Sequence, residues 1–412
     1  MKQALITIIT LFITMTSFSQ QVETKSDSLR KDALNVYMSS ANDYIKREIP
    51  YVNYVRDIKD ARVYIISTSQ YNGSGGREYT YYLTGQHEFE GMNDTISYST
   101  NPDETTDQTR EKQINCLQIG LIPYIKKTPL AQYIRISFSE PIKETVSTDK
   151  WNNWVLGLSL NTYLSGQKTS KTQQYYGSFY ANHITEKWKI EIEADFENDI
   201  TKFSSEDYSY TDKRKSNGIN ARIVKSISDH WSYGGSTGFQ YSFYSNYKSL
   251  INFMPGIEYD VYPYAESTRR QLRILYQIGY NYANYIDTTR FFKQNEDLFV
   301  HSLTSAYQVV QKWGSANFSF RYRNYLHDWS LNNIYFYGSL NYRIAKGLSL
   351  RLSANYSIIH DQLNLRKGNL SVEEILTRRK QQQTDYSYSF MIGFSYTFGS
   401  IYNNVVNPRF GG

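Results

Sequence analysis

The sequence predicts an all-β transmembrane barrel of about 12 antiparallel strands, preceded by a small α+β periplasmic domain. The first observation is the strict alternation of residues 386–398, where even positions carry large rings or aliphatic side chains and odd positions carry mostly small or polar ones. Only a strand separates two such sets onto opposite faces, one suited to lipid and the other to a wet lumen. The second is composition: the chain has 40 tyrosines and 16% aromatic residues, yet a low mean hydropathy. The third is the lack of any apolar run of about 20 residues after the first 20 positions, which argues against membrane helices.

Residues 1–19 have the pattern of a secretory signal peptide. Lys2 supplies the positive charge, residues 4–13 form the apolar run, and Ser17 and Ser19 are small residues before a cleavage site. The only cysteine is Cys116, so no intrachain disulfide can form. We expect it to be a buried, inert thiol in a helix.

Residues 27–144 form the predicted periplasmic domain, with the order αβββαβ. The expected elements are a helix at 29–47, strands at 61–69, 77–87 and 95–98, a mobile polar loop at 101–112, a helix at 109–127 and a strand at 133–138. The glycine-rich stretch 72–76 joins two strands. Because a phosphate cradle needs its glycines between a strand and a helix, we interpret this stretch as a turn. Residues 141–150 read as a linker.

Residues 151–398 form the predicted outer-membrane β-barrel, followed by a C-terminal tail at 399–412. Twelve alternating segments are expected near 152–163, 173–184, 187–200, 215–228, 231–244, 249–263, 269–285, 297–309, 314–326, 333–345, 348–360 and 384–398. Connections after even-numbered segments are short, and those after odd-numbered ones are mostly longer, as at 204–214 and 361–384. This asymmetry predicts periplasmic turns and outer loops, with Trp188, Trp231 and Trp313 in an aromatic girdle at the turns. Phe398 and Phe410 are both candidates for the terminal aromatic residue of such barrels.

Charged residues of one strand parity are the candidate functional residues. Residues 189–197 alternate Lys or acidic side chains with apolar ones, and charge cannot face lipid, so the charged set must point inward. By this logic the predicted lumen-lining residues are Glu191, Glu193, Asp195, Arg222, Glu258, Asp260, Arg273, Arg321, Arg323, Arg343 and Arg351. Two interpretations stay open: a polarised pore that selects solutes, or a salt-bridged plug that fills a narrow lumen.

Enzymatic function is the main alternative class, with outer-membrane phospholipases as the example. The six histidines are His87, His183, His230, His301, His327 and His360. No serine pattern suited to a catalytic triad accompanies them, and no pair has metal-ligand spacing on one strand face. We therefore expect no catalysis, no metal and no cofactor. The net charge of +6 is spread through the chain, so no nucleic-acid partner is expected.

The chain also shows two resemblances. With Tyr163-Leu-Ser-Gly-Gln-Lys-Thr169 and Met254-Pro-Gly-Ile-Glu-Tyr259, residues 151–398 resemble Gram-negative outer-membrane β-barrels, and loosely the salt-induced outer-membrane protein family. With Ile49-Pro-Tyr-Val-Asn-Tyr-Val-Arg-Asp57 and Asn72-Gly-Ser-Gly-Gly-Arg-Glu-Tyr79, the first 150 residues look like the amino-terminal region of uncharacterised bacterial secreted proteins.

These observations together predict a narrow channel, or a membrane anchor for a periplasmic domain, in the Gram-negative outer membrane. A purely structural or partner-docking protein is a further alternative. The expected partners are outer-membrane lipid and the barrel assembly machinery, with a periplasmic protein as a further candidate.

Overall fold

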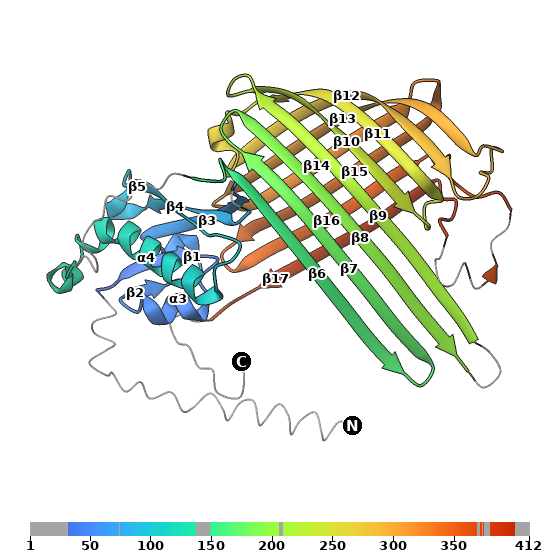
Figure 1. Ribbon diagram of the computed structural model, residues 1–412. Helices are drawn as coiled ribbons and strands as arrows, with labels where there is room; N and C mark the ends of the chain where they lie inside the picture. The colour runs from blue at the N-terminus through green and yellow to red at the C-terminus, as the bar shows by residue number, and fades with distance from the viewer. Residues whose placement is uncertain are drawn as a thin grey trace.

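The computed structural model describes residues 32–73, 75–136, 149–205, 209–368, 371–372, 374 and 380–399. It contains a small domain of strands and helices beside one end of a large curled sheet (Figure 1). The predicted signal peptide, most of the linker and nearly all of the C-terminal tail lie outside the described residues.

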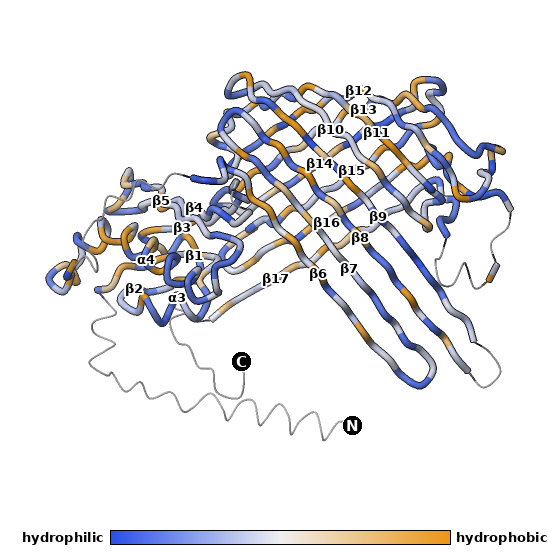
Figure 2. The backbone as a smooth tube through the Cα atoms, in the orientation of Figure 1, coloured by the Kyte–Doolittle hydropathy of each residue, from blue (hydrophilic) through white to orange (hydrophobic). Residues whose placement is uncertain are grey.

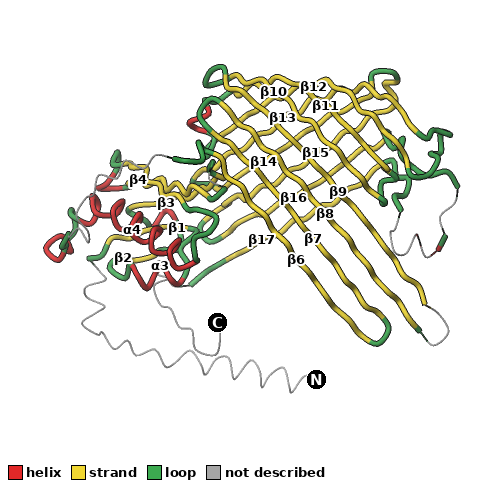
Figure 3. The backbone as a smooth tube through the Cα atoms, viewed as in Figure 1, coloured by secondary structure: helices red, strands yellow, loops and turns green. Residues whose placement is uncertain are grey.

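The small domain is built on a five-stranded sheet of order β2-β1-β3-β4-β5. Its elements are β1 (Leu34–Met38), α3 (Asp43–Glu48), β2 (Val52–Tyr54), η2 (Ile58–Asp60), β3 (Val63–Tyr71), β4 (Arg77–Gly85), η3 (His87–Phe89), β5 (Asn93–Ser99), α4 (Thr106–Ile125) and η4 (Pro129–Tyr133). Strand β1 is parallel to both neighbours, and the β3–β4–β5 pairs are antiparallel. Apart from the short η5 and the helical residues Val372 and Glu374, the described helices of Figure 3 belong to this domain.

One hydrophobic core holds the small domain together. Strands β1, β3 and β4 contribute side chains such as Leu34 and Tyr81, and α4 contributes Leu117 and Leu121, all of them at most 2% exposed. Cys116 is buried on the same helix, and burial raises its pKa to about 11. The expectation of a buried cysteine in a helix is confirmed, and a thiol that stays protonated at neutral pH is a poor nucleophile.

Two predicted elements of the small domain are wrong. Residues 29–47 do not form one helix: Leu34, Val36 and Met38 are buried at alternate positions of β1, and only Asp43–Glu48 is helical. The apolar residues fit both the helical and the strand period. They form a strand because they are buried between two parallel neighbouring strands, β2 and β3. The strand predicted at 133–138 is absent over residues 133–136: Tyr133 ends the short helix η4, which Pro129 starts, and the next three residues have no regular structure.

Two boundaries of the small domain also differ from the prediction. Strand β2 (Val52–Tyr54), which was not predicted from the sequence, pairs with β1. The loop predicted at 101–112 ends early, since α4 begins at Thr106 behind a capping box formed by Thr105 and Gln108.

The large sheet confirms the prediction of twelve antiparallel strands. They are β6 (Trp154–Gln167), β7 (Ser170–Ile184), β8 (Trp188–Ser204), β9 (Ser209–Ser226), β10 (Trp231–Ser242), β11 (Tyr247–Asp260), β12 (Arg270–Tyr285), β13 (Asn295–Gln311), β14 (Gly314–Tyr325), β15 (Asp328–Ala345), β16 (Leu348–Ile359) and β17 (Tyr386–Tyr396), with η5 (Tyr264–Glu266) between β11 and β12. Consecutive strands pair in chain order. The sheet curls until β6–β9 pass in front of β14–β17 (Figure 1). The loop predicted at 204–214 is mostly strand, because β8 and β9 extend their pairing to Ser204 and Ser209.

Alternation divides this sheet into an apolar outer face and a polar inner face. Leu160, Phe196 and Phe394 lie on the outer face and are 79%, 43% and 67% exposed. Hydrophobic and hydrophilic residues interchange along the strands in Figure 2. An exposed apolar surface that covers a whole sheet is the pattern of a protein in contact with lipid. No described helix is long and apolar enough to cross a membrane.

Closure of the barrel, however, is not observed. Strands β6 and β17 are the two edges of the described sheet, and no backbone pairing joins them. Alternation specifies which way each side chain points, but closure also depends on the stagger between strands, which the pattern leaves open. The prediction of a closed barrel is therefore wrong for this structure.

Candidate functional site

All eleven predicted lumen-lining residues lie on the inner face of the sheet. The pairing register relates them directly: Glu191 faces Arg222 on β9, and Asp260 faces Arg273 on β12. Register partners of an antiparallel pair point to the same side, so the assignment passes from strand to strand around the sheet. The small domain contacts this inner face at one end of the sheet, and residues 361–366 contact it at the other end.

The charges on the inner face pair between neighbouring strands or along one strand. Arg222 Nη1 donates to Glu191 Oε2 at 3.1 Å, and Lys189 Nζ lies 3.1 Å from Glu191 Oε1. Arg273 Nε lies 3.3 Å from Glu258 Oε2. These short-range pairs differ from the predicted opposition across the lumen. Local register decided the outcome, because a neighbouring strand offers a partner about 5 Å away.

Three acidic and basic residues of the prediction have other surroundings. Within the described residues, neither Glu193 nor Asp195 has an ion-pair partner. The guanidinium of Arg321 lies over the ring of Tyr335 at 5.5 Å, a cation–π arrangement. Among the described residues these three groups therefore take no part in a network of salt bridges.

Arg323 is held in the same way, over the ring of Tyr325 at 5.6 Å. Its Nη2 also lies 2.9 Å from the side-chain amide of Asn281, which accepts in the orientation that satisfies both groups. Arg351 lines a cavity of about 430 Å³ between β16 and the small domain. The two arginines of β14, Arg321 and Arg323, thus have aromatic and amide partners.

Arg343 belongs to the contact with the small domain, rather than to the lumen wall. It donates to Tyr37 Oη, and its Nη1 lies 3.4 Å from Asp57 Oδ2. Beside it, Lys346 Nζ lies 2.7 Å from Asp60 Oδ2. The sequence reading assigned strand parity correctly but could not show that this end of β15 meets another domain.

We call this end of the sheet, which carries the β7–β8, β9–β10, β11–β12, β13–β14 and β15–β16 connections, the turn end. The small domain lies against it in Figure 1. A second contact joins Tyr82 Oη and Thr268 Oγ1 at 2.5 Å, and the guanidinium of Arg269 lies over the Tyr82 ring at 5.0 Å. The domain therefore contacts both the β11–β12 and the β15–β16 connections.

A third contact brings the β3–β4 turn to the first strands of the sheet. A Cβ built on Gly75 would lie 3.2 Å from Tyr180 Oη and 3.5 Å from Val155 Cγ1, both on the inner face. Gly73 approaches Ile184 just as closely. Gly75 has a φ of +79°, which confirms the predicted turn. Its small size also permits the close approach to the sheet, a role that the sequence did not indicate.

The opposite end, which we call the loop end, is covered by residues 361–366. Leu363 packs with Leu298, Val300 and Tyr325 of the inner face in a small buried cluster. Asn246 Nδ2 donates to the Asn364 carbonyl oxygen at 2.9 Å. The segment is therefore fixed across the loop end rather than extending away from it.

Arg366 strengthens this attachment. Its Nε donates to Asp287 Oδ2 at 2.7 Å, and its Nη2 donates to the Phe243 carbonyl oxygen. Its side chain is only 6% exposed. A nearly buried arginine with both partners satisfied holds the β10–β11, β12–β13 and β16–β17 loops together.

The histidines have packing partners. His183 lies 5.3 Å from the Trp154 ring, and His301 packs among Tyr276, Tyr322 and Trp329. In the described parts of the chain, no three His, Cys, Asp or Glu side chains are grouped to hold a metal ion.

Trp154 begins β6, as Trp188 begins β8 and Trp231 begins β10. With Trp313, just before β14, the tryptophans mark the turn end. This is the position predicted for the aromatic girdle.

Comparison with solved structures gives structural likenesses, one of which is to a porin. The chain is similar to a solved structure described as "NanC porin structure in rhombohedral crystal form", with 11% sequence identity and a TM-score of 0.29 over 60% of this chain and 99% of that one. No protein-family model matches the chain, and no curated protein matches it. We therefore argue function from the residues of this chain alone.

Proposed function

We propose that the protein is a narrow outer-membrane channel whose small domain caps the turn end from the periplasm. The apolar outer face and the polar inner face support membrane insertion, since only this division allows a strand to meet lipid on one side and water on the other. The short turns and the longer loops support a periplasmic turn end. In this orientation the small domain lies in the periplasm.

In the membrane, we expect β6 and β17 to pair and close the sheet. An unpaired strand edge in hydrocarbon leaves N–H and C=O groups without partners, each at a cost of several kcal/mol. Strand β6 runs antiparallel to β17 in the alternating order, so the edges are compatible. A closed sheet of 12 strands lies between side-chain-filled barrels of about 8 strands and open porins of about 16.

The observation that carries the proposal is the span of the small domain across the turn end. It contacts β15 through Arg343, the β11–β12 connection through Thr268, and the inner face of β6 and β7 through Gly75. Contacts on separated parts of one rim support a position of the domain over the opening that the rim of a closed sheet would surround. Passage of a solute therefore requires this domain to move.

A non-conducting membrane anchor is the second candidate function. The 361–366 segment favours it, because Leu363 and Leu365 are only 5% and 6% exposed and cover the loop end. If both ends stay closed, the sheet serves only to hold the small domain at the membrane. Both candidates are non-enzymatic, unlike the hydrolase alternative.

A disulfide lock separates a movable cap from a fixed one. A Cβ built on Gly73 lies 3.2 Å from Ile184 Cβ, slightly below the usual range of about 3.5–4.5 Å for a disulfide. Gly73 is not among the positive-φ glycines, so a cysteine fits its backbone. The double variant Gly73→Cys/Ile184→Cys should therefore form a disulfide that links the cap to β7. The natural cysteine, Cys116, is buried and does not compete for this bond.

We expect single-channel openings in planar bilayers from the wild-type protein and near silence from the oxidised double variant. Dithiothreitol should restore wild-type openings to the double variant, while the single variant Gly73→Cys should conduct under both conditions. Wild-type conductance through the oxidised lock would show that the cap does not gate. If neither the wild-type protein nor the reduced double variant shows channel openings, the channel is excluded and the non-conducting membrane anchor is favoured.

A further inference from the structure

A cavity of about 300 Å³ lies in the inner face, on the side of the turn end, among β8 to β12. Three basic side chains line it: Lys189 on β8, Arg222 on β9 and Arg273 on β12. They come from different strands and converge on one hollow. Neither the channel proposal nor the predicted opposition of charges accounts for this arrangement.

The hollow exists because the two central strands carry small residues there. Gly234 of β10 and Gly256 of β11 are register partners, and Ser232 lies one inward position away on β10. All three line the cavity. Because these three positions carry only glycine or serine, the basic groups of β8, β9 and β12 surround a shallow floor of backbone and hydroxyl groups, with Glu258 of β11 at its edge.

The exposure of the charged groups decides the sign that a solute meets. The side chains of Lys189, Arg222 and Arg273 are 46%, 58% and 41% exposed, whereas those of Glu191 and Glu258 are only 22% and 18% exposed. The bases are therefore the more exposed charges at the cavity, while the less exposed Glu258 also lines it beside Arg273. Asp260, the register partner of Arg273, is buried still further at 1% exposure.

The carboxylates fix the bases without using all of their donors. Arg222 donates from Nη1 to Glu191. Arg273 Nε lies 3.3 Å from Glu258 Oε2 as an ion pair, without a hydrogen bond. A guanidinium has five N–H donors in a rigid plane, so each arginine retains donors of the geometry that carboxylate and phosphate groups accept. Tyr264, whose hydroxyl donates to Ser232 Oγ at 3.1 Å, closes the side of the cavity toward the turn end.

We propose that this cavity binds a small solute through an oxyanion group, carboxylate or phosphate, held by Arg222 and Arg273 with Lys189 beside them. In the channel this makes it a selective site on the solute's path, so its role in transport rests on the proposed function. Binding itself does not, because it can be measured without conductance.

Isothermal titration calorimetry of the full-length protein in detergent at low ionic strength tests the site. The probes are inorganic phosphate and glutarate, with neutral xylitol as the control solute. We expect both anions to bind and xylitol to give no heat. Arg222→Gln should weaken anion binding about tenfold or more, since a charge-assisted hydrogen bond is lost. Arg222→Lys, which keeps the charge, should weaken it less.

Arg351→Gln is the matched control, because Arg351 lies on the inner face but lines a different cavity. It should bind both anions as the wild type does. The folded state of each variant is checked by its heat-dependent shift on gels. Arg222 is the chosen position because Glu191 keeps Lys189 as a partner after its removal.

Equal losses in Arg222→Gln and Arg351→Gln would show a general effect of inner-face charge and overturn the site. Absence of binding by both anions would also overturn it, even where bilayers show conductance. Binding that depends on Arg222 in a protein that never conducts would support the site while overturning the channel.

Discussion

The small domain and the large sheet use the same types of side chain in opposite directions. In the small domain, Tyr81 and Leu121 are buried at 1% and 2% exposure. In the sheet, Tyr388 and Leu158 are 71% and 74% exposed on the outer face, and the inner face carries the ion pairs. The difference teaches that alternation defines two faces of a strand, whereas the surrounding medium decides which face is outside.

Removal of a core side chain should separate the two regions most clearly. Leu117→Ala deletes a side chain that is 1% exposed in the core of the small domain. We expect a loss of about 2–5 kcal/mol in the free energy of unfolding of that domain, from the lost burial and the cavity left behind. Urea unfolding followed by the helical circular dichroism signal measures it, since α4 is the long helix among the described residues.

Ile119→Ala on the same helix is the control, because Ile119 is 65% exposed and should cost little. The heat-dependent gel shift, which reports the sheet, should be unchanged in both variants. A matching loss of that shift in Leu117→Ala would mean that the two regions unfold as one unit, and the comparison would fail.

The sequence could predict the strands of the large sheet because their pattern is long and repeated. Alternation in residues 386–398 was read correctly, and the same parity located residues as distant as Glu191 and Arg351 on one face. Long antiparallel strands with one apolar face have a strongly specified register, because a slip by one residue would exchange the faces. Element type and side-chain direction were therefore accessible.

Contacts between distant segments were not accessible from the pattern. Nothing near Arg343 indicates Asp57, and nothing near Gly75 indicates Tyr180, since each pair joins residues from different domains. The prediction of a helix around Leu34 was wrong for a related reason. The apolar residues there fit both the helical and the strand period, and only the pairing with β2 and β3 shows that they form a strand. In these cases tertiary packing, which a local pattern does not contain, determined the outcome.

A charge on the outer face should affect the sheet and leave the small domain intact. Phe394→Arg puts a guanidinium at a position that is 67% exposed on β17. If this position lies near the middle of the bilayer, we expect a cost of about 2–4 kcal/mol. Ser395→Arg, on the inner face of the same strand, should cost much less. The fraction of heat-resistant folded band in lipid measures both, and equal losses would mean that the two faces are assigned incorrectly.

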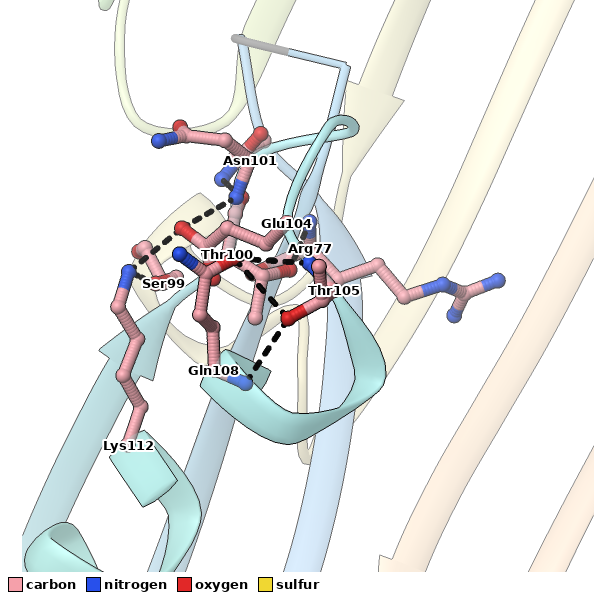
Figure 4. Close-up of polar contacts among 9 residues, drawn as sticks. Arg77, Ser99, Thr100, Asn101, Glu104, Thr105, Gln108 and Lys112 are labelled. Atoms are coloured by element: carbon pink, nitrogen blue, oxygen red, sulfur yellow. Dashed lines mark hydrogen bonds and ion pairs between the residues drawn. The ribbon is translucent and has the colours of Figure 1, made fainter. Parts of the chain in front are cut away.

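The smallest expected effect concerns the ends of the helices and strands in the two regions. Strands of the sheet end in hairpins, whereas α4 begins with side-chain caps: Thr105 Oγ1 accepts from Gln108 N at 3.3 Å, and Gln108 Oε1 accepts from Thr105 N at 2.9 Å (Figure 4). Lys112 also anchors this turn by donating to Glu104 Oε1 and to the Ser99 carbonyl oxygen.

Thr105→Ala should therefore lower the free energy of unfolding of the small domain by about 1 kcal/mol, since it removes one half of the capping box. Thr105→Ser keeps the hydroxyl and should stay within a few tenths of a kcal/mol of the wild type. The same urea titration measures both, and the gel shift of the sheet should not change. An alanine variant as stable as the serine variant would show that Lys112 and the packing of α4 hold the first turn without the cap.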